Sequence, residues 1–556
     1  MEVMLESDVP TYAGGLGVLA GDVLRSCADM HIPSVGVTLV YSGDTFDQVI
    51  NSDGTQTFLR TDWQKLDQLT KLPLRVHMSI GGMPAVLGVW RYDIVGFDGF
   101  VVPVYLLDTN RLENPQWIRD FTTNLYGGSH ENRFCQELIL GIGGVRMLRA
   151  LGYKDIKTYH LNEGHTAFVP LELLAERGYA DEAVKASCVF TSHTPVPEGH
   201  DKFDYELAYH FGGNYLPWHI KNLAGNDCLS MTHLAMNLSH KSFAVSQKHK
   251  AVSEHILPGF KFDYVTNGIH HPTWAAPTMQ NLLDHYMPDW HLDPSKLAAA
   301  PAMLPDDRLW EHHQDAKSKL IRVVNHHLTS PNSYWENEHP YQGELFDVNT
   351  LTISLARRPV GYKRPLLLYR DLERFVRIGA GRIQVIQCGK SHPDDNISQD
   401  FVKEIVKISK KFKDILRIVF LENYSPKITR ILVSGSDVWL NNPKRPMEAS
   451  GTSGMKAAVN GVLNFSVLDG WWIEAYRQNP QAGFAIGPFD DSVAPTNSDE
   501  SDADDLYEKL EHQIIPLYYE DRKAWIFRMK QAISLGAYFN TNRVVSEYKS
   551  KGWDQS

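Results

Sequence analysis

Short apolar runs alternate with helical patterns along almost the whole chain, and this alternation limits the possible folds more than any other feature. The clearest runs lie at 35–41, 100–107, 188–192, 351–356, 382–389, 417–424 and 438–441. Strands that alternate with helices favour parallel β-sheets covered by helices. The chain has 556 residues, and chains longer than about 250–300 residues usually divide into domains. The sequence therefore predicts an α/β protein with two large domains.

A break in this pattern lies near Asn267, where the segment DYVTNGIHHPTWAAP places turn residues and prolines after a short strand. Beyond it, residues 275–345 have a mostly helical pattern, and a second α/β region begins at Leu351. We predict two Rossmann-like domains, residues 1–267 and 268–556, with a hinge near Asn267.

Composition and charge exclude several classes of partner. The net charge is −11, so the chain lacks the overall basic charge of a nucleic-acid-binding protein, although a local basic patch could still bind an anionic substrate. No apolar run reaches the roughly 18 residues of a membrane span, and the N-terminal residues do not resemble a signal peptide. Five scattered cysteines without a CxxC motif favour a reducing compartment. We expect a soluble, cytoplasmic protein without a membrane or nucleic-acid partner.

Three stretches contain candidates for anion binding, and the first is the glycine cluster Gly14-Gly15-Leu16-Gly17. The cluster follows a short strand pattern and opens a helical run. Glycines let the backbone approach an anion closely, and the N-terminus of a helix supplies free N–H groups. A tight turn between a strand and a helix would use the same residues, and the motif alone does not decide between the two.

The second stretch, TISLARRPVGYKR, places Arg357, Arg358 and Lys363 after a strand pattern of about six residues. Open α/β sheets bind ligands at the carboxyl ends of their strands. Arginine offers a fork to phosphate oxygens, and lysine offers a compact charge. The alternative is a solvated basic helix start, which the stretch taken alone would favour.

The third stretch, EASGTSGMK, offers hydroxyl and N–H groups from Ser450 to Gly454 for a second phosphate. Lys456 follows among small and apolar residues, where an amine is poorly solvated and becomes nucleophilic, as a Schiff-base lysine requires. Glu448 lies at the entrance of the loop and could bind sugar hydroxyls. A purely structural or Walker-like turn is the alternative, but the Walker spacing is absent.

Smaller polar groups follow other strand patterns: Asn162, Glu163 and His165 in one place, His193 in another, and Asn267 at the hinge. Each alone is more often a cap or loop residue, although all lie where a cleft between two such domains is expected. The three His-His pairs have no acidic or cysteine partner at ligand spacing, so no metal site is expected.

Together these stretches resemble the α-glucan phosphorylase family, which includes glycogen, starch and maltodextrin phosphorylases. The segment EASGTSGMKAAVNGVLNFSVLDGWW is very similar to the family's cofactor-lysine signature. The glycine cluster and the segments HLNEGHTAFVPLELLAERG, SHTPVPEGHDKF, VTNGIHHPTW, ARRPVGYKR and VFLENY follow in the family's order. The chain is more similar to the short bacterial and archaeal forms than to the animal enzymes. The resemblance implies a glycosyltransferase-B architecture, with two Rossmann-like domains facing a central cleft.

The resemblance also implies a cofactor and the residues that bind it. Lys456 would carry pyridoxal phosphate as a Schiff base. Arg357 and the loop of Gly451 and Thr452 would hold the phosphate of the cofactor, and Tyr424 would line its pocket.

The substrate site follows from the same resemblance. Arg358, Lys363 and the N–H of Gly15 would hold inorganic phosphate. The glucosyl unit would be bound by Glu448, Ser450, Gly451, Asn267 and His193, with Leu16 and Glu163 nearby. The expected catalytic residues are Arg358, Lys363, Glu448, His193 and Asn267.

The implied reaction is phosphorolysis of the terminal α-1,4-linked glucose of a glucan, giving glucose 1-phosphate with retained configuration. The phosphate of the cofactor would exchange a proton with inorganic phosphate. Inorganic phosphate would protonate the glycosidic oxygen and then attack the same face of the sugar. The protein would contribute positioning and charge stabilisation. The resemblance also implies a homodimer. The sequence begins almost at the glycine cluster, whereas the animal members have regulatory elements in a longer N-terminal region, so we expect an enzyme without their AMP control.

Three alternatives remain open. A nucleotide-sugar-dependent glycogen or starch synthase could share the architecture, but it needs no Schiff-base lysine. A glycan-binding paralogue without activity would be expected to lose Lys456, Arg358 or Lys363, and all three are present. A pyridoxal enzyme of amino-acid metabolism would pair the ring nitrogen with an acidic residue, which no motif marks.

Overall fold

The computed structural model describes residues 1–6, 9, 11–41, 45–61, 68–126, 128–330, 333–335, 341 and 343–554. The chain forms two compact units. The first comprises Met1–Thr45, Thr61–Asn267 and Thr541–Ser556, and the second comprises Phe46–Arg60 and Gly268–Asn540. Both units are mixed α/β structures that contain parallel sheets.

The second unit is built on a six-stranded parallel sheet in the order β15-β14-β13-β16-β17-β18. The strands are β13 (Leu351–Ala356), β14 (Ile383–Cys388), β15 (Arg417–Leu421), β16 (Val438–Asn441), β17 (Leu463–Val467) and β18 (Gly483–Ile486). Every residue of β13, β14, β17 and β18 is buried, which explains why these strands appear in the sequence as continuous apolar runs. The order along the sheet is that of a doubly wound fold, and it reverses between β13 and β16, where such sheets bind ligands.

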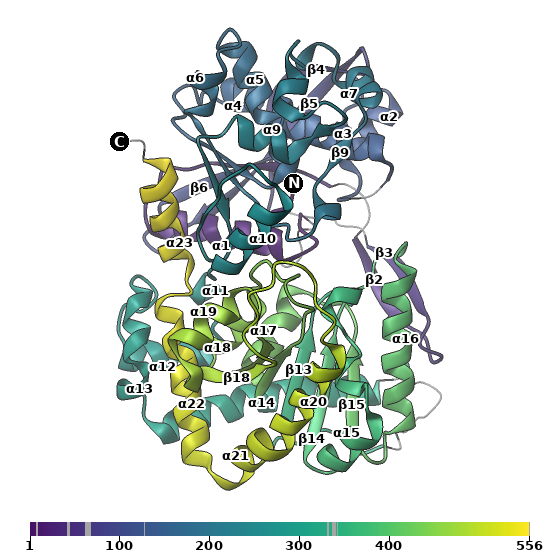
Figure 1. Cartoon of the computed structure of the whole chain (residues 1–556), viewed down its shortest axis with the longest axis vertical. Coiled ribbons are helices and arrows are strands. Elements are labelled where there is room, and N and C mark those ends of the chain that lie inside the picture. Colours follow the sequence, from purple (N-terminus) through teal and green to yellow (C-terminus); the bar gives the residue numbers. More distant parts are fainter. Residues whose placement is uncertain are drawn as a thin grey trace. The chain divides into compact units, whose positions relative to one another are not determined.

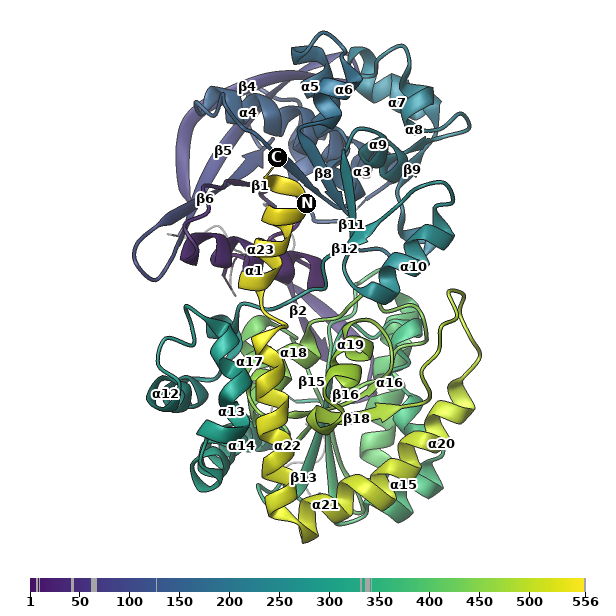
Figure 2. The same cartoon turned by 60° about the vertical axis from the view of Figure 1, so that its left-hand side comes forward.

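Helices cover both faces of this sheet (Figure 2), with α14 and α22 on one side and α15 and α16 on the other. The helices of the unit are α11 (His271–Trp274), α12 (Pro277–Tyr286), α13 (Ala300–Met303), α14 (Asp306–Thr329), α15 (Leu372–Gly379), α16 (Asn396–Lys411), α17 (Pro426–Gly435), α18 (Ser453–Val459), α19 (Trp471–Gln478), α20 (Asp499–Lys509), α21 (Ile515–Glu520) and α22 (Arg522–Ser534). The segment 275–345, which was expected to be helical, contains α12, α13 and α14, and its described residues include no strand.

The first unit contains two four-stranded sheets, in the orders β12-β11-β8-β7 and β1-β6-β5-β4. The first sheet is parallel and the second is mixed. The strands are β1 (Gly36–Leu39), β4 (Thr70–Ile80), β5 (Met83–Val95), β6 (Val101–Asp108), β7 (Tyr159–Asn162), β8 (Cys188–Thr191), β11 (Lys241–Ala244) and β12 (Asp263–Tyr264), with the short pair β9 (Lys202–Phe203) and β10 (Leu229–Ser230). The long antiparallel hairpin β4–β5 was not predicted. Gly81 and Gly82 form its turn with φ of +56° and +75°, as a two-residue hairpin requires.

The helices of the first unit surround these sheets. They are α1 (Gly15–Asp29), α2 (Gln116–Arg119), α3 (His130–Leu138), α4 (Gly144–Ala150), α5 (Val169–Glu176), α6 (Asp181–Lys185), α7 (Tyr205–Gly212), α8 (Ile220–Ala224), α9 (Met231–Asn237), α10 (Gln247–Ile256) and α23 (Thr541–Tyr548). All five cysteines of the chain lie in the described part and are free thiols.

The two units differ from the predicted domains, 1–267 and 268–556, in two places. Residues 541–556 pack in the first unit, where α23 lies along α1 (Figure 1). Val545 is fully buried in a core cluster that includes Cys27, and the hydroxyls of Ser26 and Thr541 are 2.6 Å apart. Residues 46–60 instead belong to the second unit. Each segment belongs to the unit that contains the residues it packs against, and these residues are distant from it in the sequence.

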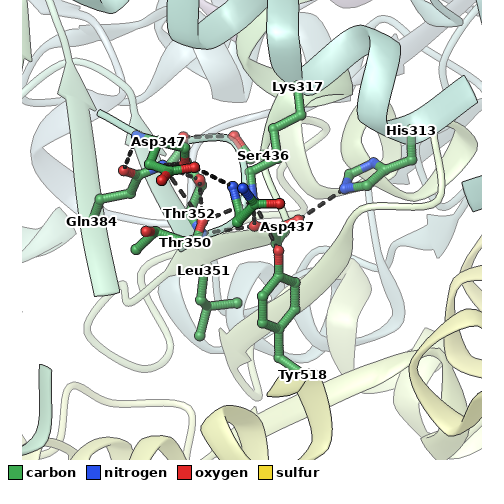
Figure 3. Close-up of polar contacts among 12 residues, drawn as sticks. His313, Lys317, Asp347, Thr350, Leu351, Thr352, Gln384, Ser436, Asp437 and Tyr518 are labelled. Carbon is green, nitrogen blue, oxygen red and sulfur yellow. Dashed lines mark hydrogen bonds and ion pairs between the residues drawn. The ribbon is translucent and has the colours of Figure 1, made fainter. Parts of the chain in front are cut away.

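A buried ionic network ties α14 to the amino ends of β13 and β16 (Figure 3). Nζ of Lys317 lies 2.5 Å from Oδ2 of Asp437, and Nε2 of His313 lies 2.8 Å from Oδ1 of the same residue. Lys317 also donates to the carbonyl of Thr350, and the backbone N–H of Thr352 donates to Asp437. The side chains of Lys317 and Asp437 are completely buried, so each charge depends on the other.

We expect the substitution Lys317→Met to lower the free energy of unfolding by about 3–5 kcal/mol, because it leaves the Asp437 carboxylate buried without its cation. The control is Lys407→Met, since Lys407 pairs with Glu404 on the surface of α16 and such pairs contribute little. Urea unfolding followed by tryptophan fluorescence measures both. Equal midpoints for the two variants would contradict a dependence of the fold on this network.

Candidate active site

The predicted cofactor residues lie in the second unit, in segments that follow the carboxyl ends of strands of its parallel sheet. Arg357 directly follows β13, Asn441 ends β16, and the loop 448–452 leads into α18, which carries Lys456. In a parallel sheet these strand ends lie on one edge, which is where ligands bind in open α/β sheets.

The loop of Ser450, Gly451 and Thr452 is held against the turn that precedes α19. The backbone N–H of Glu448 donates to the Asp469 carboxylate at 2.9 Å, and the N–H of Trp471 donates to the carbonyl of Ser450 at 3.0 Å. Gly470 has a φ of +54°, and a Cβ atom there would lie 2.4 Å from the Ser450 carbonyl oxygen. The loop is therefore held at a fixed place, with Thr452 as the last residue before α18.

Lys456 lies on α18 and is only 5% exposed. Its neighbours Met455, Ala457 and Ala458 are also buried. Its Nζ lies 3.8 Å from the centre of the Trp274 indole ring, so an aromatic face covers the amine. An amine in such a setting is the kind that forms a covalent link with a carbonyl compound.

Asn460, the residue that follows α18, holds the Trp274 segment against this helix. Its Nδ2 donates to the carbonyl of Trp274 at 3.0 Å, and its Oδ1 accepts from the N–H of Ala276 at 2.8 Å. The amide thus fixes the distance between α18 and the aromatic ring that covers Lys456. Neither Trp274 nor Asn460 was singled out in the sequence, because their roles depend on packing between distant segments.

Gly454 of α18 packs so closely against its neighbours that a larger side chain does not fit there. A Cβ at Gly454 would lie 2.2 Å from Oδ1 of Asn464 and 2.8 Å from the Trp471 ring. We expect Gly454→Ala to displace the helix, to destabilise the chain by about 1–3 kcal/mol and to weaken binding of a ligand linked to Lys456. The control is Gly144→Ala at the start of α4, where a Cβ would meet its nearest atom at 3.4 Å. Thermal unfolding and pyridoxal phosphate titration test both variants, and indistinguishable behaviour would contradict the packing argument.

Arg357 is a fixed cation in this site. Its guanidinium donates to Oδ1 of Asn441 and to Oδ1 of Asn442, and burial lowers its pKa to about 10, with nearby Glu448 and Tyr424 acting in the opposite direction. The side chain remains cationic at neutral pH and is oriented by two amides. A fixed cation of this kind can hold an anion, and the predicted role of Arg357 in binding the cofactor phosphate stays a prediction.

Lys363 and Glu448, predicted to bind phosphate and sugar respectively, form an ion pair. Their side chains are 16% and 10% exposed. Burial acts to lower the pKa of Lys363, but Glu448 and Tyr362 outweigh it and the pKa is raised. Lys363 is therefore charged in the structure, and its partner is a carboxylate of the same site.

Arg358 pairs with a different carboxylate from Lys363 in the structure. Its side chain is 58% exposed, and its Nη2 lies 3.4 Å from Oδ2 of Asp395 at the start of α16. An exposed pair of this kind contributes little energy, so the side chain is easily reoriented. Tyr424, the last of the predicted cofactor residues, follows β15, and burial raises its pKa to about 12.

Three of the polar residues predicted in the first unit, Asn162, Glu163 and His193, form one cluster. Oε2 of Glu163 accepts hydrogen bonds from the N–H of His193 at 2.7 Å and from the Thr194 hydroxyl at 2.9 Å, and Oε1 accepts from the N–H of Gly164. Nε2 of His193 lies 2.7 Å from Oδ1 of Asn162. Burial, together with the nearby His249 and His160, lowers the pKa of His193 to about 3. His193 is therefore neutral at physiological pH.

Glu163 itself is in an unusual conformation, with a φ of +81°. A residue with a β-carbon rarely adopts the left-handed region, and such strain concentrates at functional sites. Because its carboxylate makes three hydrogen bonds to the neighbouring backbone and Thr194, its role in the structure is to shape the loop that carries His193.

Asn267 is 7% exposed, and among the described residues no hydrogen-bond donor reaches its Oδ1. Its backbone is fixed, since its N–H donates to the carbonyl of Val245 and its carbonyl accepts from Arg543. A buried polar atom without a partner is costly in a folded protein. The side chain is thus suited to bind a ligand.

Gly15 is the first residue of α1, and a Cβ there would meet no atom within 4 Å. Leu16 is partly exposed beside it. Sequence reasoning missed Glu2, whose Oε2 accepts hydrogen bonds from the N–H groups of Ala13 at 2.6 Å and Gly14 at 2.9 Å. A charged residue inside the apolar run MEVML was the only available signal.

Two protein-family models match the sequence of this chain. A family model described as carbohydrate phosphorylase matches residues 214–517, which include the Arg357, Lys363 and Lys456 segments. A second model, the starch synthase catalytic domain, matches residues 8–256.

Whole proteins are similar over almost the entire chain. The maltodextrin phosphorylase of Thermococcus litoralis is 36% identical over 100% of this chain and 70% of its own length. The glycogen phosphorylases of Aquifex aeolicus and Mycobacterium tuberculosis are 33% and 34% identical, over 97% of this chain and 83% and 68% of their own lengths. The chain belongs to the carbohydrate phosphorylase family, and the predicted resemblance to the α-glucan phosphorylases is confirmed.

Two further observations concern the described residues. None of their helices is long and apolar enough to cross a membrane. Within the same residues, no group of three or more His, Cys, Asp or Glu side chains is placed to hold a metal ion.

Proposed function

We propose that the chain is an α-glucan phosphorylase that uses inorganic phosphate to release the terminal α-1,4-linked glucose of a glycogen- or maltodextrin-like chain as glucose 1-phosphate. The observation that carries this proposal is the buried amine of Lys456 under Trp274, at the end of a hydroxyl- and glycine-rich loop. The names of the relatives, maltodextrin and glycogen phosphorylase, support the substrate class. We also propose the glycosyltransferase-B architecture, of which the doubly wound sheet would be one half.

The residues present fit pyridoxal phosphate. Lys456 supplies an amine for its aldehyde, the Gly451–Thr452 loop supplies N–H and hydroxyl donors, and Arg357 supplies a fixed cation for its phosphate. Tyr424 would contribute a wall of the same pocket. When bound, the cofactor supplies a phosphate group that acts in proton transfer to the substrate phosphate.

The substrate phosphate would take Lys363 and Arg358 as its cations, with the N–H of Gly15 as a further donor. In the structure each cation already pairs with a carboxylate, Glu448 or Asp395. Binding of phosphate would therefore exchange carboxylate for phosphate at Lys363, and this exchange would free Glu448 to accept hydrogen bonds from sugar hydroxyls. These cations would stabilise the phosphate as it attacks the sugar.

The sugar would be bound by polar groups that follow strands of the parallel sheets. We assign this role to Asn267, His193, Ser450, Gly451 and Glu448, with Leu16 in apolar contact and Glu163 holding the His193 loop. Neutral His193 can donate or accept a hydrogen bond without adding charge, which suits a sugar that passes through a cationic transition state.

The alternative is a nucleotide-sugar-dependent synthase, which the match of residues 8–256 to the starch synthase domain favours. Two parallel assays separate the functions. Incubated with maltodextrin, the protein is expected to form glucose 1-phosphate in proportion to added inorganic phosphate. Glucan extension from ADP-glucose, without phosphate-dependent product, would instead establish the synthase.

A further inference from the structure

The hairpin formed by β2 (Thr45–Ile50) and β3 (Gln56–Thr61) belongs to the second unit from Phe46 to Arg60, although the sequence on both sides of this segment belongs to the first. It lies alongside α16 (Figure 1). Nζ of Lys410 donates to the carbonyl of Ser52 at 2.6 Å, and Nε2 of Gln56 donates to the carbonyl of Gln399 at 3.2 Å. These contacts hold the outer part of the hairpin.

The edge of β2 pairs with the loop that follows β15. Oδ1 of Asn423 accepts from the N–H of Gln48 at 2.6 Å, and Nδ2 of Asn423 donates to the carbonyl of Gln48 at 3.1 Å. Oε1 of Glu422 accepts from the N–H of Ile50 at 2.7 Å. Gln48 and Ile50 are two residues apart, so their backbone groups face the same edge of the strand. Two side chains of the loop thus pair with this edge as a neighbouring strand would.

Because the β2 edge is buried, breaking its hydrogen bonds to Asn423 and Glu422 would cost free energy. Gln48 is completely buried and Ile50 is 2% exposed. If Asn423 moved away, both backbone groups of Gln48 would lose their partner in a place where water does not readily replace it. The hairpin therefore restricts the loop as much as the loop restricts the hairpin.

The restricted loop carries a residue of the proposed cofactor pocket. Asn423 has a φ of +56° and reverses the chain between β15 and α17. The next residue is Tyr424, which hydrogen-bonds to Thr429 and is close enough to Arg357 for the guanidinium charge to act on its pKa. Because Tyr424 is bonded directly to Asn423, a change in the backbone of Asn423 moves the tyrosine relative to Arg357.

The hairpin contacts a second loop on the same edge of the sheet. Nζ of Lys390, two residues after β14, lies 4.4 Å from the centre of the Phe46 ring, and His392 packs edge-on against this ring. The N–H of Arg357 donates to the carbonyl of Cys388 just before this loop. The hairpin thus supports the loops after β14 and β15, both of which adjoin Arg357.

We propose that Asn423 is a positioning residue for the cofactor pocket: by pairing with Gln48 of the β2–β3 hairpin it holds Tyr424 in place, and so raises the affinity for pyridoxal phosphate. This inference rests on the proposed function, since the ligand of the pocket is the proposed cofactor.

The test measures the dissociation constant of pyridoxal phosphate for the full-length chain by absorbance titration. Asn423→Gly keeps the left-handed backbone but removes both hydrogen bonds, and is expected to raise the constant about tenfold. Asn423→Ala adds backbone strain and should raise it at least as much, whereas Asn423→Asp keeps the acceptor for the N–H of Gln48 and should have a smaller effect. Thr55→Ala, at the exposed tip of the hairpin, should leave the constant unchanged.

A double-mutant cycle shows whether Asn423 acts through Tyr424. In a Tyr424→Ala background, Asn423→Gly is expected to change the constant less than about twofold, since the group that it positions is gone. Hydrogen exchange of residues 46–60 should increase in Asn423→Gly and not in Thr55→Ala.

The possible failures are distinguishable. Increased exchange with an unchanged constant, or an equal effect of Asn423→Gly with and without Tyr424, would overturn the positioning role alone. Wild-type protein that does not bind pyridoxal phosphate would overturn the proposed function and this inference with it. Should Asn423→Gly fail to fold, Asn423→Asp gives the same comparison at smaller amplitude.

Discussion

Lys456→Ala is expected to abolish phosphorolysis while the chain stays folded. The amine of Lys456 is the group on α18 that can form a covalent link, and no other lysine lies among the residues of the loop or the helix. Without the link, the cofactor would be held only by non-covalent contacts with Arg357 and the Gly451–Thr452 loop. The protein as purified should lose the visible absorbance of the cofactor, and glucose 1-phosphate formation should fall by more than about a thousandfold, comparable to the loss of an essential catalytic group.

Two controls accompany this variant. Lys456→Arg keeps a cation near Trp274 but cannot form the link, and should be equally inactive. Lys427→Ala removes an exposed lysine of α17 and should retain full activity. Substantial phosphorolysis by Lys456→Ala, in protein that contains no other covalently bound cofactor, would show that the reaction does not depend on this residue.

Removal of Arg358 or Lys363, the two cations proposed to bind the substrate phosphate, should reduce phosphorolysis more than any other change except the loss of Lys456. Phosphate next to a second phosphate is repelled strongly in a site that excludes water, so fixed cations are required. We expect Arg358→Ala and Lys363→Ala each to raise the KM for phosphate and to lower kcat, with a loss of about 2–4 kcal/mol in transition-state stabilisation. Cofactor content should be kept, because Arg357 and the loop remain.

The two variants should differ in one respect that follows from the structure. Arg358 is exposed and pairs weakly with Asp395, whereas Lys363 pairs with Glu448 at a mostly buried position. Lys363→Ala leaves the Glu448 carboxylate without its cation, so it should also lower the thermal stability, while Arg358→Ala should not. Arg374→Ala is the control, since Arg374 also pairs with a carboxylate, Asp504, but lies on α15. Normal phosphate kinetics in both variants would place the substrate phosphate elsewhere.

The strands of the second unit were predictable because parallel strands covered on both faces are apolar throughout. The predicted runs 351–356 and 438–441 coincide with β13 and β16. The run 417–424 extends three residues beyond β15, which ends at Leu421. The chain turns there because Asn423 adopts a left-handed backbone and pairs with Gln48, which is 375 residues away in the sequence. A local apolar pattern contains no information about such a distant partner.

The identity of the site residues was more predictable than their contacts. The motif around Lys456 indicated a lysine in an apolar place, and the structure buries it. The aromatic cover by Trp274 and the pairing of Lys363 with Glu448 join segments that are distant in sequence. Such contacts depend on how strand ends meet at one edge of a sheet, and single-sequence patterns do not specify them.

The attachment of pyridoxal phosphate to Lys456 is the central claim, and borohydride reduction tests it most directly. Borohydride makes the link between the cofactor and its lysine permanent, and peptide mass mapping then locates it. We expect the adduct on the peptide that contains the sequence GTSGMK, at Lys456, with no adduct in the Lys456→Ala variant. An adduct on a different lysine, or no adduct in protein that was purified with the cofactor present, would contradict the account.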